Sequence, residues 1–276
     1  MGPKRTLSEL RGAPQQKNRA SQFRRYRMVT SVGIAPNLLQ ALADITRQLE
    51  ITQLRVTTGL RVSGPKDDPA AFAIAQNARG DIAGVTAVKT ALATGDTTIA
   101  AAISAGESIA DLLAEIKAKA VSATDSSLSA ATRTALHNDF LALRDQITSI
   151  VLSAEFNNIN LIQSAATTLT VLATQQGSTI AITSQALDAT TLGLNTLDLT
   201  TSGNAATALT AASTAITSAA NKVANLGSSA TRIEAQSDFT GKLVDILEAE
   251  VGNQVDADLT QESARLTLLQ IQEQLA

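Results

Sequence analysis

The 276-residue chain contains no cysteine and no tryptophan, and it has a single histidine and a single tyrosine. Without cysteine it can form neither a disulfide nor a thiolate metal site. The lone histidine, His137, has no second imidazole or thiol to complete a zinc site or a nucleophile–base pair. We therefore expect His137 to be exposed or hydrogen-bonded rather than to act as a ligand or base. The scarcity of aromatic side chains also leaves little bulk for one thick globular core.

Motifs that carry enzyme chemistry are lacking as well. The sequence contains no GxxxxGK[ST] phosphate loop, no HExxH zinc motif and no GxSxG nucleophile elbow. Carboxylate pairs do occur, with a spacing compatible with a glycosidase-type acid–base pair; they are Asp67/Asp68, Glu248/Glu250 and Asp256/Asp258. Each pair lies at a predicted helix start or on a helix surface, where solvation and the helix dipole account for it. The EF-hand pattern is also missing. We expect no catalytic residue, no metal site and no cofactor.

Long apolar runs are absent too. No uninterrupted run reaches the roughly 18 residues that a membrane helix needs. The basic N-terminus is not followed by an apolar segment of about 7–15 residues with a small-residue cleavage site, which is the pattern of a secretory signal peptide. We expect no membrane insertion, and export by another route if the protein leaves the cell.

Positive charge is concentrated at the N-terminus. Residues 1–27 carry eight lysines and arginines against the single acidic residue Glu9, and they show no apolar periodicity. The remaining residues include 14 basic and 24 acidic side chains, a net charge of −10. We interpret residues 1–27 as a disordered leader, or as sequence upstream of a start at Met28. A nucleic-acid or anionic-surface arm is the alternative for such a segment.

Alanine, leucine, isoleucine and valine dominate what is present, and long segments place them at helical spacing. A first helix begins near Asn37, and its apolar face contains Leu38, Leu42, Ile45, Leu49 and Val56. A much longer pattern covers residues 69–123, and its stripe is Ile74, Ile82, Val85, Val88, Leu92, Ile99, Ile103, Leu113 and Ile116. Four glycines interrupt this stripe, each costing about 1 kcal/mol relative to alanine. Packing against neighbours must therefore hold the helix together.

Two further helices complete the pattern before the C-terminal segment. One covers residues 129–152 after the turn cluster at 124–127. The other covers residues 204–251 and carries a coiled-coil seam of two seven-residue series; these are Leu209, Ile216 and Val223, with Ala212, Ala219, Leu226 and Ile233. Between them, alternation around Gln175-Gln176-Gly177-Ser178 predicts a β-hairpin. The fold class is therefore mainly α, an elongated antiparallel bundle or coiled coil of long helices with one small β-hairpin.

Two breaks separate the terminal helices from the middle of the chain. Gly59, Gly64 and Pro65 end the first helix. Asp68 is placed to cap the next helix, which starts with Pro69. At the other end, Gly252-Asn253 interrupts the pattern, and Asp256 and Asp258 open a last helix with Leu259, Leu266 and Leu269. The order of elements is nearly a palindrome, so we expect the two ends to pair.

Three segments resemble signatures of bacterial flagellins. The first is Thr58-Gly59-Leu60-Arg61-Val62, followed by Lys66-Asp67-Asp68 and Ala73-Ile74-Ala75. The second is Glu155-Phe156-Asn157-Asn158 with Leu161, after the third predicted helix. The third is Val255-Asp256-Ala257-Asp258-Leu259 with Glu262-Ser263. They occur in the family's order and cover about residues 28–276.

The resemblance implies a fold in which the paired terminal helices form an inner filament core, the D0 region of the family. The middle helices and the hairpin would form the surrounding D1 rod. D0-like helices would then occupy residues 28–60 and 253–276, D1-like helices residues 61–168 and 203–252, and the hairpin region residues 169–202, with 1–27 as leader. Little room remains for a large variable outer domain, so the chain resembles the short flagellins of alphaproteobacteria.

The implied function is a structural subunit of the flagellar filament. Such a subunit leaves the cell unfolded through the flagellar type III apparatus and polymerises through its terminal helices for motility, in an extracellular filament. The implied partners are further copies of the chain, an export chaperone, and cap and junction proteins, with no nucleic acid. Residues expected to serve assembly, or a hinge between core and rod, are Leu42, Ile45, Leu49, Gly59, Leu60, Arg61, Gly64, Asp67, Asp68, Asp256, Asp258 and Leu259.

The sequence departs from the family pattern at its two ends, and two alternative functions stay open. The basic residues before Met28 are foreign to the family, and its usual tail is not seen after Ala276, so we expect a missing tail. One alternative is a cell-surface flagellin homologue that binds an acidic polysaccharide through residues 1–27, Arg47, Arg55, Arg61 and Lys66. The acidic remainder of the chain opposes this by long-range repulsion. The other is a hook–filament junction protein, which has similar ends, but the 155–158 segment favours flagellin.

Overall fold

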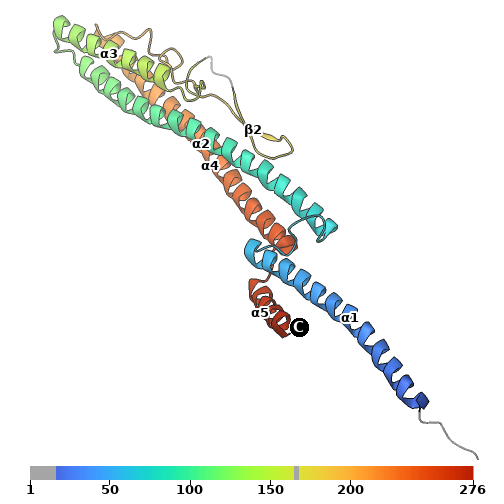
Figure 1. Ribbon diagram of the computed structural model, residues 1–276. Coiled ribbons are helices and arrows are strands. Elements are labelled where there is room, and N and C mark those ends of the chain that lie inside the picture. The colour runs from blue at the N-terminus through green and yellow to red at the C-terminus, as the bar shows by residue number, and fades with distance from the viewer. Residues whose placement is uncertain (1–16, 165–167, 276) are drawn as a thin grey trace, which may run out of the picture. The chain divides into compact units, whose positions relative to one another are not determined.

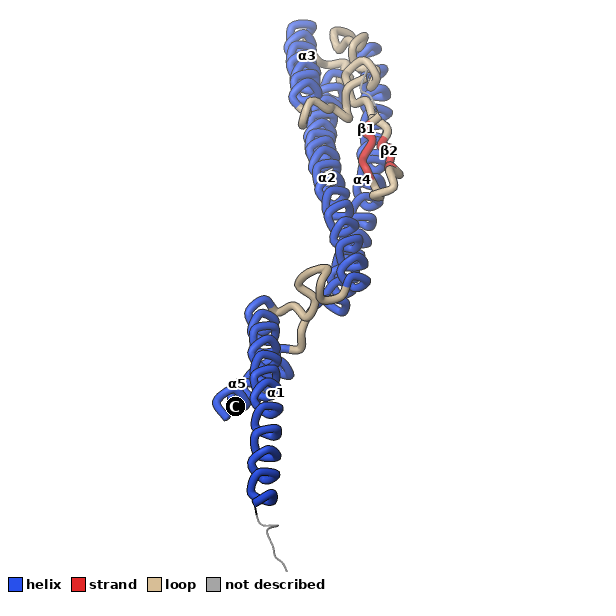
Figure 2. Tube along the Cα trace, turned by 45° about the vertical axis from the view of Figure 1, so that its right-hand side comes forward, coloured by secondary structure: helices blue, strands red, loops and turns tan. Residues whose placement is uncertain are grey.

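The computed structural model describes residues 17–164 and 168–275, with side chains from residue 37 onward. This part of the chain forms five α-helices and one two-stranded antiparallel sheet (Figure 1; Figure 2). The helices are α1 (Lys17–Thr58), α2 (Pro69–Ala123), α3 (Ala130–Ser153), α4 (Ser202–Val255) and α5 (Leu259–Leu275), and the strands are β1 (Leu169–Leu172) and β2 (Thr179–Ile182). The mainly α fold with one small hairpin is confirmed.

The chain divides into two compact units. The terminal unit combines the described residues up to Ala73 with those from Asn253 onward, and the middle unit is Ile74–Gly252. The boundaries that the sequence predicted between core-like and rod-like regions, near residues 60 and 252, stay predictions.

Large side chains on α2 and small ones on α4 build the core of the middle unit. Figure 1 shows these two helices side by side. From α2 come the fully buried residues Leu92, Ile99, Ile109, Leu113 and Ile116, and from α4 come the buried alanines Ala205, Ala208, Ala212, Ala215 and Ala219. Pairing large with small residues lets two helices approach closely and still fill the space between them. Few aromatic side chains are needed for such a core.

The predicted seven-residue series are found in this core. Val85, Leu92 and Ile99 are buried on α2. On α4 the series Ala212, Ala219, Leu226 and Ile233 is buried, while Leu209, Ile216 and Val223 are partly buried against it. Ile74, predicted for the α2 stripe, is 45% exposed. That placement was wrong because the buried face at the start of α2 runs through Ala71, Ala75 and Ala78.

Two glycines of α2 mark close approaches by other elements. A Cβ at Gly95 would lie 2.6 Å from Cγ2 of Val171 in β1, and a Cβ at Gly106 would lie 2.6 Å from Cγ2 of Val223 in α4. Neither distance is sterically possible without movement. The two glycines therefore allow β1 and α4 to pack directly on the backbone of α2, and this contact offsets their poor helix propensity.

The third helix and the hairpin follow local rules. Ser129 caps α3, since its hydroxyl accepts from the Thr132 amide at 3.1 Å. Strands β1 and β2 pair from Leu169↔Ile182 to Leu172↔Thr179, and Val171 and Ile182 face the core. The turn between them contains Gly177 at φ +91°. The predicted hairpin and its turn are confirmed.

Many threonine and serine hydroxyls on the long helices bond to their own helix. On α2, the Thr90 hydroxyl donates to the Thr86 carbonyl at 3.1 Å and the Thr94 hydroxyl donates to the Thr90 carbonyl at 3.0 Å. On α4, Thr210, Thr214 and Thr217 do the same toward the carbonyl four residues earlier. These exposed hydroxyls are therefore satisfied without a neighbouring side chain.

The start of α1 differs from the prediction. Residues 17–27, expected to be part of a disordered leader, have helical backbone because α1 begins at Lys17. Lysine, arginine and glutamine are good helix formers, so charge without apolar periodicity did not imply disorder. The rest of the predicted leader, residues 1–16, lies outside the described residues.

The predicted break at Gly252-Asn253 is also wrong. Helix α4 continues through both residues to Val255, and the chain leaves helical geometry only at Asp256-Ala257-Asp258. A glycine costs a helix about 1 kcal/mol relative to alanine, which is too little by itself to end a long helix. Asp258 marks the true restart, since its carboxylate accepts from the Thr260 amide at 2.9 Å and the Gln261 amide at 3.1 Å.

We predict opposite effects for alanine at two glycines of α2. Gly106→Ala forces a Cβ against Val223, which is β-branched and held in one rotamer on a helix. Overpacking costs about 1–3 kcal/mol and exceeds the propensity gain of about 1 kcal/mol, so urea unfolding should show a loss of stability. Gly80→Ala is the matched control, because nothing lies within 4 Å of its added Cβ. It should stabilise the middle unit, and a stabilising Gly106→Ala would contradict the close approach.

Candidate functional site

The first predicted break is a compact joint in the terminal unit, formed by residues 58–68 and 254–258. Gly59 ends α1 in left-handed geometry at φ +73°, and its amide donates to the Arg55 carbonyl at 2.8 Å. A residue with a side chain is strained in this conformation, which explains why glycine follows the last helical residue. Gly59 thus turns the chain out of α1 and toward residues 255–257.

Main-chain hydrogen bonds join the two ends of the protein at this joint. The amides of Arg61 and Val62 donate to the Val255 carbonyl at 2.7 and 3.2 Å, and the Ala257 amide donates to the Gly59 carbonyl at 2.8 Å. They form an isolated antiparallel bridge between Leu60 and Asp256. Val62 and Val255 are buried beneath it. Two segments that the sequence singled out separately are therefore in direct contact.

Two neighbouring carboxylates fix the loop that follows. One oxygen of Asp67 accepts from the Ser63 hydroxyl at 2.8 Å and from the amides of Ser63 and Gly64 at 2.9 and 3.2 Å. These hydrogen bonds, led by the Ser63 hydroxyl, hold the pKa of Asp67 below its ordinary value of 3.8. Asp68 caps α2 by accepting from the amides of Ala70 and Ala71, both at 3.0 Å. The predicted N-cap is confirmed.

The terminal helices α1 and α5 pack on each other but bury few side chains (Figure 2). Thr52, Glu262 and Leu269 are buried on them, while Leu42, Ile45, Leu49 and Leu266 are only half-buried. Large apolar side chains remain exposed on both helices, namely Leu38, Leu39, Ile51 and Leu54 on α1 and Leu259, Leu268, Ile271 and Leu275 on α5. A shallow groove on α1 runs between Leu39, Leu42 and Glu50.

An ion pair that the sequence did not single out crosses this interface. Arg55 Nη1 lies 3.1 Å from Glu262 Oε1, with side chains 27% and 12% exposed. The other carboxylate oxygen, Oε2, is buried and has no hydrogen-bond partner among the side chains that the structure describes. Glu262 and the buried Leu269 are seven residues apart and so lie on the same face of α5. A charged residue on this apolar face was the feature of the sequence that could have indicated a buried ion pair.

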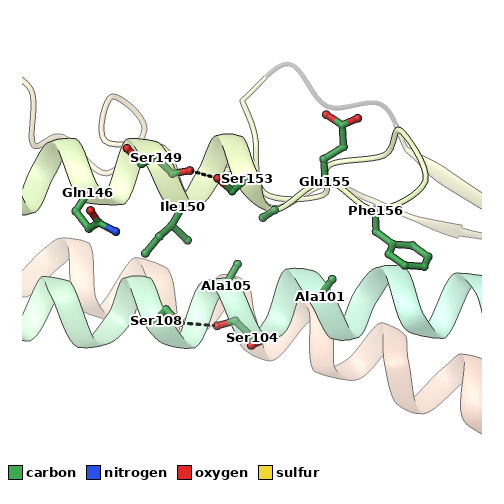
Figure 3. A pocket seen from close by; sticks show the side chains of 11 residues that line it. Ala101, Ser104, Ala105, Ser108, Gln146, Ser149, Ile150, Ser153, Glu155 and Phe156 are labelled. Atoms are coloured by element: carbon green, nitrogen blue, oxygen red, sulfur yellow. Dashed lines mark hydrogen bonds between the residues drawn. The ribbon is translucent and has the colours of Figure 1, made fainter.

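The middle unit has a second groove, but it holds no catalytic arrangement. The groove lies between α2 and α3, has a volume of about 390 Å³ and is lined mainly by serine and alanine (Figure 3). The hydroxyls of Ser108 and Ser153 donate to carbonyls of their own helices at 3.0 and 2.8 Å. Figure 3 shows Phe156 at one end and the Glu155 carboxylate pointing away from α2. No acid, base and nucleophile converge here among the labelled side chains.

The remaining chemistry is structural. The Leu199 amide donates to Nδ1 of His137 at 3.4 Å, and this nitrogen lies 3.7 Å from Asp198 Oδ1, so the histidine is hydrogen-bonded as expected. Across residues 17–164 and 168–275, no group of three or more potential metal ligands comes together. The helices of this part of the chain also include none that is apolar over a length sufficient to cross a membrane.

The joint, the pairing of α1 with α5 and the long helices are features of a helical structural protein. Two family models identify which one. The bacterial flagellin N-terminal helical region matches residues 29–167, and the bacterial flagellin C-terminal helical region matches residues 209–276. The chain belongs to the bacterial flagellin family and is a structural subunit of the flagellar filament, an extracellular appendage.

Individual relatives agree with this assignment. The chain is 41% identical to flagellin FljO of Caulobacter vibrioides over 238 residues, which is 86% of this chain and 87% of the relative. It is 33% identical to a flagellin of Brucella melitensis over 250 residues, or 86% of this chain and 88% of the relative. These relatives support the short alphaproteobacterial type that the sequence predicted.

The fold has a solved counterpart at low identity. The structure of a Vibrio parahaemolyticus protein described as a flagellar hook-associated protein superposes with a TM-score of 0.59. It is 12% identical and covers 69% of this chain and all of its own. At this identity the likeness concerns the fold alone.

We predict that the hydrogen bonds from Ser63 and Gly64 to the Asp67 carboxylate are lost only at a pH below the ordinary pKa of aspartate, 3.8. Because the folded pKa is lowered, the bonds to Ser63 and Gly64 contribute fully above pH 3.8 and are lost as the pH falls through the folded pKa. The NMR amide shifts of Ser63 and Gly64 should therefore titrate with a midpoint below pH 3.8. In Asp67→Asn the same amides should not titrate. A midpoint at or above the ordinary value would contradict the hydrogen bonds described.

Proposed function

We propose that this flagellin polymerises through its terminal helices, and that the exposed apolar side chains of α1 and α5 are the surfaces that neighbouring copies cover. The observation that carries the proposal is the incomplete burial of these helices. Half or more of the surface of Leu38, Leu39 and Leu268 is exposed, although α1 and α5 already pack on each other. A soluble monomer rarely leaves large apolar side chains clustered in water.

The packing of α1 on α5 explains why a second copy is needed. Helix α5 is short, so it offers one narrow face to α1 and leaves apolar side chains on the others. Each leucine newly buried by a neighbour contributes about 1.5–3 kcal/mol. A head-to-tail contact of this kind uses different surfaces on the two copies and does not close on itself, so it extends into a filament. Leu42, Ile45, Leu49 and Leu259 belong to this surface.

The joint would orient the terminal helices during assembly. Gly59, Leu60, Arg61 and Asp256 hold the ends of α1 and α5 together through the bridge, and Asp258 caps the start of α5. Gly64, Asp67 and Asp68 hold the loop that leads into α2. The hinge role expected for the two glycines stays a prediction. The same is true of export in an unfolded state through the type III apparatus, and of the partners other than the chain itself: an export chaperone, cap and junction proteins, and an acidic polysaccharide.

We predict that an aspartate on the half-buried face of α1 prevents filament formation. Leu42→Asp or Ile45→Asp places a charge where a neighbour must exclude water, so the critical concentration for polymerisation should rise at least about tenfold, or 1.4 kcal/mol. Sedimentation and electron microscopy of the induced polymer measure this. Circular dichroism should show the middle unit still folded, because its core contains neither residue.

The matched control is Gln48→Asp, which adds the same charge at an exposed position of α1. It should polymerise within about twofold of the unchanged protein, since surface charges contribute little. Filaments of normal length from Leu42→Asp and Ile45→Asp would refute polymerisation through this face.

A further inference from the structure

The face that α5 buries is not its most apolar one. The line that α5 turns toward α1 has three- and four-residue steps and contains Leu259, Glu262, Leu266 and Leu269; Glu262 and Leu269 are buried and Leu266 is half-buried. Leu268, Ile271 and Leu275 form a second line on the other side of the helix, which carries no charge and is exposed. If apolar burial alone set the rotation of α5 about its axis, the helix would turn this uncharged line toward α1. Something other than apolar burial therefore selects the face that is used.

The buried carboxylate supplies that selection. Glu262 reaches Arg55 at 3.1 Å in a setting where both side chains are largely covered. Rotating α5 to bury Leu268, Ile271 and Leu275 would carry Glu262 away and leave the Arg55 guanidinium without its partner. Breaking a buried ion pair costs more than this rotation returns, because Leu266 and Leu269 would lose their cover as the other three side chains gain it.

Arg55 is a fixed reference point for this choice. It lies in the last turn of α1, next to the joint, and its charge also contributes to the low pKa of Asp67 in the adjoining loop. The bridge between Leu60 and Asp256 sets the level at which α5 begins. The bridge does not set the rotation of α5 about its own axis, which depends on the side chains that α5 packs against α1.

We propose that the Arg55–Glu262 ion pair determines which face of α5 packs on α1, and thereby keeps Leu268, Ile271 and Leu275 outward for contact with a second copy of the chain. The pair acts as a positioning device within the polymerising surface, so the inference rests on the proposed function. A buried polar contact costs stability, but it excludes the alternative rotation of α5. In that rotation the apolar side chains would be buried within one molecule and could not contact a second copy.

The rotation of α5 can be measured directly, because the chain contains no cysteine. Spin labels at Gln48→Cys and Gln270→Cys, both exposed positions, report the distance from α1 to one side of α5 by pulsed EPR on the full chain. A narrow distribution is expected for the otherwise unchanged protein. Arg55→Met and Glu262→Ala should shift or broaden it, since each removes one partner of the pair.

Two further variants control for general damage. Glu273→Ala removes an exposed glutamate of the same helix and should leave the distance unchanged. The double variant R55M/E262L replaces the ion pair by an apolar pair at the same place, so it should restore the narrow distribution that R55M alone loses. Restoration shows that the single variants still fold and that the contact itself selects the face.

Assembly provides the second readout. The critical concentration of Arg55→Met and Glu262→Ala should rise about tenfold, while that of Glu273→Ala and R55M/E262L should stay within about twofold. An unchanged EPR distance in both single variants overturns the proposal. A changed distance with an unchanged critical concentration overturns the link to a second copy. Normal filaments from Leu42→Asp would instead remove the proposed function, and the EPR result on α5 would stand.

Discussion

Close approach of α2 and α4 is the constraint on which the middle unit depends. A chain with few aromatic side chains can bury enough apolar surface only if its helices come near one another along much of their length. The alanines of α4 permit that approach against the leucines and isoleucines of α2, and Gly106 extends it to direct contact with Val223. The hairpin uses the same device, since Val171 lies against Gly95. Small residues therefore do here what large side chains do in a globular core.

Local and periodic features of this fold could be predicted from the sequence. The start of α2 at Pro69, the cap at Asp68, the hairpin and the seven-residue series of α4 all follow from spacing and turn chemistry that act within a few residues. The errors concern how far helices extend and which face they bury. Residues 17–27 and Gly252-Asn253 are helical, and Ile74 lies outside the buried face although its residue type suits a core. Single residues other than proline change helix propensity by only about 1 kcal/mol or less, which does not fix where a long helix ends.

The candidate site divides in the same way. Gly59, Asp67, Asp68 and Asp258 were visible because each performs a local task at a helix end or a loop. The contact between Arg55 and Glu262 joins residues 207 positions apart, and the flagellin signature that includes Glu262 does not indicate its partner. It could be found only once the two ends of the chain were placed together. The joint thus combines predictable local geometry with a long-range contact that decides how the terminal helices face each other.

The hydroxyls that bond to their own helices affect how readily these surfaces lose water. Thr90, Thr94, Thr210 and Thr214 already donate to a backbone carbonyl, so each holds its hydration shell less firmly than a lysine or glutamate would. Covering such a surface releases weakly held water and breaks few strong solvent contacts. Dehydration of these threonine-rich helices on close packing therefore requires less free energy than dehydration of a surface rich in lysine or glutamate.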